Sequence, residues 1–369
     1  MRNRSTRSAL AAALFAAAAL LAPARAEAQA VIKVNDTVFF KFGIQLQAWA
    51  DWSQDSATQG YSQNLYLRRA RLLVGGQLAP DVTFFFQTDN GNLGKAPKSL
   101  GTGLLVQDAY VEWKIADAFI LDAGEFLVPL SRNGLQSTLS FFTLDISPTS
   151  TVFATPSGTN GLRDTGFQAK GYLVEGHLEY RAAVFQGLRA SASTTNAVSN
   201  NSFRGSGYLQ YNFFETEKGY VFAGTNLGKK KILNVSTGMD AQSSYSAYSG
   251  NVFAAIPVGK GDEVGGQVQC IHYDGSDFIK TLPRQNDYLV EAAYYVSKAK
   301  VQPFAKWESQ RFSEAVDQVN DVDRYGVGLN YYVSAQNFKI SAQYLRVNYK
   351  ADGKSGTNQF TVQLQAFYF

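Results

Sequence analysis

Cysteine and histidine are scarce in this sequence of 369 residues. Cys270 is the only cysteine, so no disulfide can form within the chain. His177 and His272 are the only histidines, and neither stands in a metal-ligand cluster or beside a Gly-x-Ser-x-Gly nucleophile elbow. We therefore expect no metal site, no cofactor and no catalytic residue, which argues against an enzyme.

Long apolar runs and linkers are also missing. No run of eighteen apolar residues follows residue 30, which excludes a transmembrane helix from that part of the chain. With nine prolines and no low-complexity segment, a single domain is the simplest organisation. Aromatic residues, at 14%, and glycine, at 32 residues, are abundant instead. This composition favours strands and tight turns, and hence an all-β fold.

Residues 1–30 have the pattern of a cleaved signal peptide. A start with three arginines precedes an apolar run that is too short to span a bilayer, and Ala28-Gln29-Ala30 has the form of a cleavage site. Cleavage after Ala26 is equally permissible. Cleavage after Ala30 leaves one domain, residues 31–369, and removes four arginines and one glutamate, so the formal net charge falls from +4 to +1. Without a basic tail, no nucleic-acid partner is expected.

Apolar and polar residues alternate along most of the remaining chain. A membrane barrel and a soluble β-sandwich both alternate, so the period alone leaves the two architectures open. For a barrel, the period places Arg69 and Arg71 in the lumen, and Tyr66 and Arg68 on the outward face. The side chains expected to face lipid are Leu46, Leu72, Val111, Val290 and Val327, and those expected to face the lumen are Gln45, Arg71, Asp108, Glu291 and Lys306.

The spacing of the alternating runs separates the two architectures. We count about sixteen runs, and the connections between them are long and short in turn, as in outer-membrane barrels. The rhythm predicts one closed antiparallel barrel with both mature termini on the short-turn side. Two connections break it: residues 215–229 are long where a turn is expected, and the connection near Ser243 is short. The long connections are residues 53–63, 90–103, 129–165, 187–201, 275–285, 312–322 and 350–358.

The C-terminal residues give a further sign. The chain ends on Phe367-Tyr368-Phe369, which resembles the last strand that outer-membrane barrels present to the barrel-assembly machinery. Phe360 and Leu364 share one face of this run, whereas Phe369 falls on the other face, which a β-bulge would explain. Together with the export signal and the loop lengths, this ending predicts an outer-membrane barrel in contact with lipid.

An ordered set of motifs spans the chain after residue 30 and resembles the phosphate-selective porins O and P. This resemblance implies a sixteen-stranded homotrimeric porin with a channel that is lined by basic residues and narrowed by an inward-folded third loop, here residues 129–165. The motifs are Leu67-Arg68-Arg69-Ala70-Arg71-Leu72, Asp108-Ala109-Tyr110-Val111-Glu112, Gly124-Glu125-Phe126-Leu127-Val128-Pro129, Arg163-Asp164-Thr165-Gly166, residues 180–187 and Val301-Gln302-Pro303-Phe304-Ala305-Lys306-Trp307-Glu308.

Fixed positive charges in a narrow passage would favour anions such as phosphate, because the planar guanidinium group binds oxyanions with paired hydrogen bonds. The alternative is that these bases pair with lumen carboxylates such as Asp108, Glu112, Glu179 and Glu291 and only brace the wall. The candidate pore-lining, anion-binding residues are Arg69, Arg71, Arg132, Arg163, Arg181, Arg204, Arg324 and Lys306.

The third loop weakens the case for phosphate specificity. Residues 129–165 contain no lysine, and their bases, Arg132 and Arg163, are offset by Asp145 and Asp164. The sequence thus predicts a channel for passive diffusion of small solutes with a preference for anions, and phosphate or polyphosphate as possible solutes. A non-selective diffusion porin is the main alternative. A structural or adhesive barrel and a barrel hydrolase are further alternatives.

Overall fold

The computed structural model describes residues 30–95, 103–159, 161–189, 202–351 and 353–369. Residues 1–29, almost all of the expected signal peptide, lie outside this part. Within it, none of the helices has the length and apolar character needed to cross a membrane. The first strands are β1 (Ala30–Lys33), β2 (Phe39–Gln54), β3 (Tyr61–Ala79), β4 (Val82–Asp89), β5 (Leu105–Ala116), β6 (Phe119–Leu127), β7 (Arg163–Leu173), β8 (Leu178–Phe185) and β9 (Arg204–Asn212). The others are β10 (Ile232–Gln242), β11 (Tyr245–Val258), β12 (Asp262–Asp274), β13 (Gln285–Tyr295), β14 (Val301–Phe312), β15 (Val322–Ser334), β16 (Phe338–Tyr349) and β17 (Thr357–Tyr368).

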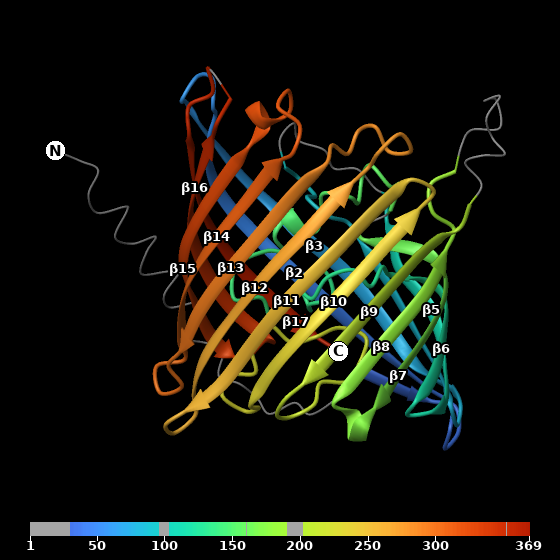
Figure 1. Ribbon diagram of the computed structural model, residues 1–369. Helices are drawn as coiled ribbons and strands as arrows, with labels where there is room; N and C mark the ends of the chain where they lie inside the picture. Colours follow the sequence, from blue (N-terminus) through green and yellow to red (C-terminus); the bar gives the residue numbers. More distant parts are fainter. Residues whose placement is uncertain (1–29, 96–102, 160, 190–201, 352) are drawn as a thin grey trace.

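Strands β2–β17 form one closed antiparallel barrel, which confirms the predicted sixteen-stranded fold (Figure 1). Each strand pairs with the next along the chain, and β17 closes the ring by pairing with β2 from Gln359↔Ser53 to Tyr368↔Ile44. Closure leaves no unpaired sheet edge. The short β1 pairs with Phe39–Phe42 of β2, just past the point where β17 ends.

The two ends of the barrel differ in their connections. At the short-turn end lie residues 80–81, 117–118, 259–261 and 335–337, together with β1 and the C-terminus. Gly259 and Gly261 have φ of 58° and 102°, which glycine adopts without a Cβ clash. Most connections at the opposite, long-loop end are longer. The exceptions seen in the sequence persist: residues 243–244 are a tight turn at the long-loop end, and residues 213–231 are a long connection at the short-turn end.

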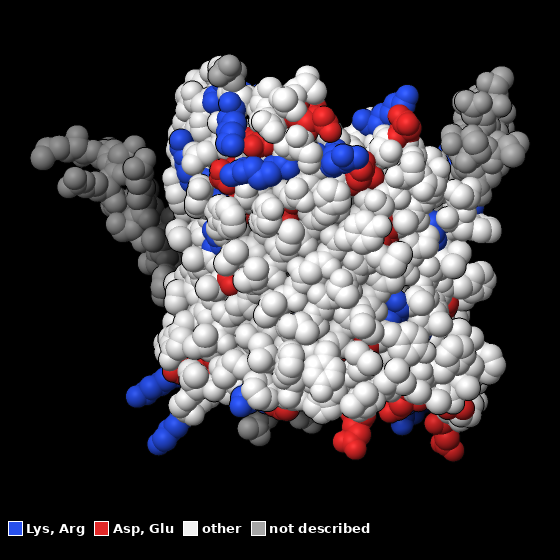
Figure 2. Space-filling view, viewed as in Figure 1, with Lys and Arg blue, Asp and Glu red and all other residues white. Residues whose placement is uncertain are grey.

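The wall has an apolar outer face and a polar inner face. All five side chains that were expected to face lipid are 38–55% exposed, whereas Gln45, Arg71, Asp108 and Glu291 are at most 6% exposed. The Lys306 side chain is also buried. These burial values confirm the predicted register. Figure 2 shows the outer face as a broad, mostly uncharged band between charged rims, as expected for a wall in contact with hydrocarbon.

The predicted positions of Tyr66 and Arg68 were wrong. A β-bulge interrupts the β2–β3 ladder between the pairs Gln47↔Arg69 and Ala48↔Leu67. Because Arg68 is the extra residue, the alternation reverses there, and Arg68 and Arg69 both reach the lumen. Nε of Arg68 lies 2.7 Å from Oδ2 of Asp145, and Tyr66 is only 6% exposed.

Residues 128–162 follow β6, and all of them except residue 160, which is outside the described part, lie inside the barrel. Their backbone and side chains bond to strands on different sides of the wall: the Thr143 hydroxyl donates to Glu291 on β13 at 2.9 Å, Ser249 on β11 donates to the Leu130 carbonyl at 2.5 Å, and Gln45 on β2 donates to the Thr138 hydroxyl at 2.9 Å. Only a segment in the lumen can meet all three strands. The segment ends earlier than the predicted residue 165, because β7 begins at Arg163.

Residues 213–231 enter the lumen from the short-turn end and meet residues 128–162. The Ser137 amide donates to the Phe222 carbonyl at 2.8 Å, and the Phe222 amide donates to the Leu135 carbonyl at 2.9 Å. Nη1 of Arg132 lies 2.9 Å from a carboxylate oxygen of Glu217. The buried apolar residues Leu135, Phe222 and others form one cluster there. Two segments from opposite ends of the barrel therefore fill part of its interior together.

Candidate pore constriction

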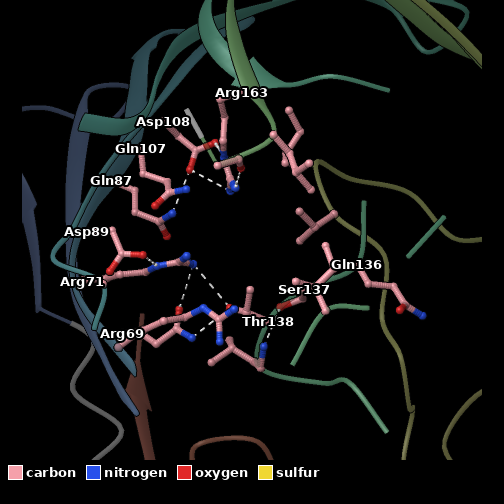
Figure 3. A pocket seen from close by; sticks show the side chains of 18 of the residues that line it. Arg69, Arg71, Gln87, Asp89, Gln107, Asp108, Gln136, Ser137, Thr138 and Arg163 are labelled. Carbon is pink, nitrogen blue, oxygen red and sulfur yellow. Dashed lines mark hydrogen bonds and ion pairs between the residues drawn. The ribbon is translucent and has the colours of Figure 1, made fainter. Parts of the chain in front are cut away.

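A cavity of about 780 Å³ lies in the lumen between the β3–β6 wall and residues 128–162 (Figure 3). Figure 3 shows charged and amide side chains along the strand wall, facing Gln136, Ser137 and Thr138 of the inner segment. The charged residues that line the cavity are Arg68, Arg69, Arg71, Arg163, Asp89, Asp108 and Asp145.

Arg68 and Arg69 both bind Asp145, which residues 128–162 bring to the bulge of β3. Arg68 uses Nε and Arg69 uses Nη2, and Nη1 of Arg69 also donates to Gln47 Oε1 at 2.7 Å. Burial by itself raises the pKa of the Asp145 carboxyl, but the two adjacent guanidinium groups hold that pKa below its usual range. Asp145 is therefore a carboxylate at neutral pH and offsets one of the two arginines.

Arg71 has one strong partner. Its Nε lies 2.9 Å from Oδ2 of Asp89 on β4. Its Nη1 makes only long contacts, 3.5 Å to Gln45 and 3.4 Å to Thr138, which are weak as hydrogen bonds. The Nη1 side of the Arg71 guanidinium is thus only weakly held, and a passing anion could bind there.

Arg163, the first residue of β7, forms an ion pair with Asp108 of β5. Its Nε and Nη2 lie 3.2 and 3.3 Å from the two oxygens of Asp108, and its Nη1 donates to the Gly161 carbonyl at 2.7 Å. The Tyr220 hydroxyl also donates to Asp108. With its side-chain amide turned so that both atoms have partners, Gln107 bridges Asp89 and Arg163. A connected polar network therefore links three wall strands to residues 213–231.

The charges of the cavity nearly balance. Four guanidinium groups and three carboxylates line it, which leaves a formal net charge of +1. In a confined site with a low local dielectric, even one uncompensated charge acts more strongly on an ion than it would in water. The arrangement can therefore bias the passage of ions by sign, but it does not concentrate several free positive charges.

Aromatic side chains line the part of the cavity that lies nearer the short-turn end than the charged residues do. Phe85 on β4 pairs with Tyr110 on β5. This pair lies two residues along each strand from the pair Gln87↔Asp108, on the same face of the sheet. The Tyr110 and Tyr220 ring centroids are 4.8 Å apart, and the Phe85 ring lies 6.2 Å from Tyr220 and 5.7 Å from Phe369. All four rings line the cavity.

Three of the predicted anion-binding residues lie outside this cavity. Arg132 is held by Glu217 and stacks 3.8 Å from the Phe253 ring centroid. Arg181 pairs with Glu179 at 2.7 Å and donates to backbone carbonyls of residues 219 and 220. Arg204 binds both carboxylate oxygens of Asp240. At 0–3% exposure, these groups fasten the inner segments to the wall.

The last two predicted residues lie on a different part of the wall. Lys306 on β14 binds Glu308 at 3.0 Å, and Arg324 on β15 pairs in register with Glu308 and donates to Gln310 at 2.8 Å. The structure therefore brings together Arg69, Arg71 and Arg163 of the eight candidates and adds Arg68.

Sequence reasoning missed Arg68, Asp89 and Tyr220. Asp89 follows the period of Phe85 and Gln87 along β4, so the alternation could have placed it. The signal for Tyr220 was the overlong connection at the short-turn end. For Arg68 the sequence holds no such signal, because no turn residue or glycine marks the bulge.

A closed sixteen-stranded antiparallel barrel with an uncharged outer band and a charged cavity inside defines an outer-membrane porin. Comparison with models of protein families identifies the porin family to which the chain belongs. It belongs to the phosphate-selective porin O and P family, whose model matches residues 40–225. The chain matches no curated protein sequence. For the family, the sequence-based resemblance is thus confirmed.

Solved structures agree with the barrel fold at low identity. OprB of Pseudomonas putida has a TM-score of 0.65 at 7% identity, with 89% of this chain and 94% of that chain covered. The outer-membrane channel DcaP of Acinetobacter baumannii has a TM-score of 0.59 at 10% identity, with coverage of 91% and 99%. OmpT of Vibrio cholerae, an outer-membrane protein solved in a trimer form, has a TM-score of 0.57 at 11% identity, with coverage of 90% and 100%.

Proposed function

We propose that this porin lets small solutes diffuse passively across the outer membrane with a preference for anions. The observation that carries the proposal is the cluster of Arg68, Arg69, Arg71 and Arg163 on one cavity with only three opposing carboxylates. The low dielectric of a narrow lumen strengthens the attraction of the remaining charge for anions. Because the cluster is fixed by ion pairs, it needs no reorganisation when a solute passes.

The same ion pairs favour modest anion preference over a dedicated phosphate site. Arg69, Arg71 and Arg163 each hold a carboxylate already, and a doubly charged phosphate would have to compete with it. Among the described residues that line the cavity, none is a lysine. Phosphate is therefore one permeant anion among several.

The proposal includes the assembly of the protein. A cleaved signal peptide, residues 1–30, would export the chain, and the barrel-assembly machinery would then recognise the last strand, which ends at Phe369. The structure of OmpT in a trimer form supports a homotrimer for this chain as well. Phe369 itself lies at the cavity, so the outward side chains of β17, such as Phe360 and Leu364, are better placed to meet another protein.

Reversal potentials in planar bilayers test the selectivity. In a KCl gradient we expect the parent protein to prefer chloride. Removing Arg69 and Arg71 together as Arg69→Ala/Arg71→Ala leaves two guanidinium groups against three carboxylates, so the preference should turn toward cations. Arg284→Ala is the matched control, because the Arg284 side chain is 51% exposed and outside the cavity.

Two alternative functions predict other outcomes. A general diffusion porin would give a reversal potential near zero that the double substitution leaves unchanged, and the arginines would then only brace the wall. A purely structural barrel would show no conductance at all in the same bilayer.

A further inference from the structure

The aromatic group of the cavity has no role in attracting simple anions. Phe85, Tyr110, Tyr220 and Phe369 come from β4, β5, residues 213–231 and the C-terminus, yet their rings meet in one place. A passage for inorganic ions alone needs polar walls, since apolar walls cannot replace the hydration shell. Aromatic faces instead bind apolar and aromatic groups.

Two wall glycines make room for one of these rings. A Cβ on Gly75 would come within 2.8 Å of Cζ of Phe369, and a Cβ on Gly43 would come within 2.6 Å of Cδ2 of the same ring. Any larger residue at either position would displace the ring from the cavity. The sequence thus leaves two positions of neighbouring strands without side chains, and the terminal ring packs edge-on against Phe85 there.

The charged and aromatic groups are adjacent along the wall. Phe85 and Tyr110 are each two residues from Gln87 and Asp108 on their own strands, a step of about 7 Å in extended chain. Asp108 forms an ion pair with Arg163. The Tyr220 hydroxyl donates to Asp108, and the Tyr220 ring packs at a tilt against Tyr110. A solute can therefore contact a guanidinium group and an aromatic face at the same time.

We infer that the solutes of this channel are monoanions with an aromatic body, such as arene monocarboxylates. The carboxylate would bind the guanidinium groups, led by Arg71, and the ring would lie against Phe85 and its aromatic neighbours. A formal charge of +1 in the cavity matches one negative charge better than the two or more of phosphate or polyphosphate. This inference rests on the proposed anion preference and specifies the class of anion.

Block of the chloride current by added organic anions tests the inference on the parent protein. Benzoate and acetate carry the same charge and differ by the ring. We expect half-block by benzoate at a concentration about two- to tenfold lower than by acetate, the range that one aromatic contact provides. Phosphate should block less strongly than benzoate.

A pair of neighbouring phenylalanines supplies matched variants. Phe85 lines the cavity, whereas Phe86 points to the outer face and is 36% exposed. Phe85→Ala should remove most of the difference between benzoate and acetate while the chloride preference in a KCl gradient stays, because the arginines are intact. Phe86→Ala should change neither quantity. Phe85→Leu keeps the apolar volume without the ring and serves if Phe85→Ala does not form a heat-stable barrel.

The outcomes separate this inference from the proposed function. If the parent shows no chloride preference, the proposed function fails. If the parent prefers chloride but benzoate and acetate block alike, or phosphate blocks best, the function stands and the aromatic solute class is refuted. Equal effects of Phe85→Ala and Phe86→Ala would also refute it, because Phe86 does not line the cavity.

Discussion

Single arginines in this lumen occupy two different environments. Arg69, Arg71 and Arg163 border a cavity and share it with carboxylates, whereas Arg132, Arg181 and Arg204 are enclosed between the inner segments and the wall. A buried ion pair is costly to break, because the remaining charge loses its partner without regaining water. The first group can act on solutes, and the second group holds the structure.

Asp145 supplies one of the three negative charges of the cavity, so a single substitution there changes the net charge of the cavity. Asp145→Asn removes the carboxylate shared by Arg68 and Arg69, so the net formal charge of the cavity should rise by one. We expect a stronger anion preference in a KCl gradient. Asp277→Asn, in an exposed loop, changes the charge of the protein equally and should have no effect. An unchanged reversal potential in both variants would contradict a role for the cavity charge.

Glu217 tests the bracing role of Arg132. Glu217→Gln leaves the Arg132 guanidinium buried without its carboxylate, which should destabilise the contact of the two inner segments by about 3–5 kcal/mol. We expect faster proteolysis within residues 213–231 and noisier single-channel current. Asp117→Asn is the control, because it removes only exposed ion pairs, from Lys218 at 3.4 Å and from Lys114 at 2.7 Å. Similar proteolysis rates for both variants would mean that the buried pair does not fasten the segment.

At the scale of elements, the β3 bulge decides which arginines reach the lumen. Deletion of Arg68 should restore a regular β2–β3 ladder and leave three guanidinium groups against three carboxylates, so we expect the anion preference to fall to nearly none. Arg68→Ala keeps the bulge and removes the same charge, and it should give the same selectivity. If the deletion prevents barrel formation while Arg68→Ala does not, the bulge is needed for closure and not only for the position of a charge.

The sequence predicts the wall elements well and the lumen elements poorly, for a physical reason. Alternation arises because one face of each strand meets hydrocarbon, so residues such as Leu72 and Glu291 could be placed from the sequence alone. Residues 213–231 follow no such period, and their path depends on contacts such as Phe222 with Leu135, which are far apart in the chain. The cavity arginines could be named, but their separation from Arg132 and Arg204 follows from that path.

At the scale of the whole molecule, stability and conductance have separate origins. The wall is held by continuous ladders between every pair of neighbouring strands, including β17 with β2. The lumen is partly filled by residues 128–162 and 213–231, which meet through Phe222 and the Arg132–Glu217 pair. A change in the filling should therefore alter the passage without opening the wall.

Replacement of residues 216–230 by a two-residue Gly-Asn turn, which joins the paired residues Glu215 and Lys231, tests this separation. The turn type suits the antiparallel β9–β10 pair, and the ladder Asn234↔Asn212 to Ala241↔Gly205 remains. We expect a barrel that still migrates as a folded, heat-modifiable species and a several-fold larger single-channel conductance, because the inner contact with residues 128–162 is lost. Its anion preference should weaken, since a wider passage screens the arginines with more water and salt. A variant with unchanged conductance would show that residues 128–162 alone set the width of the passage.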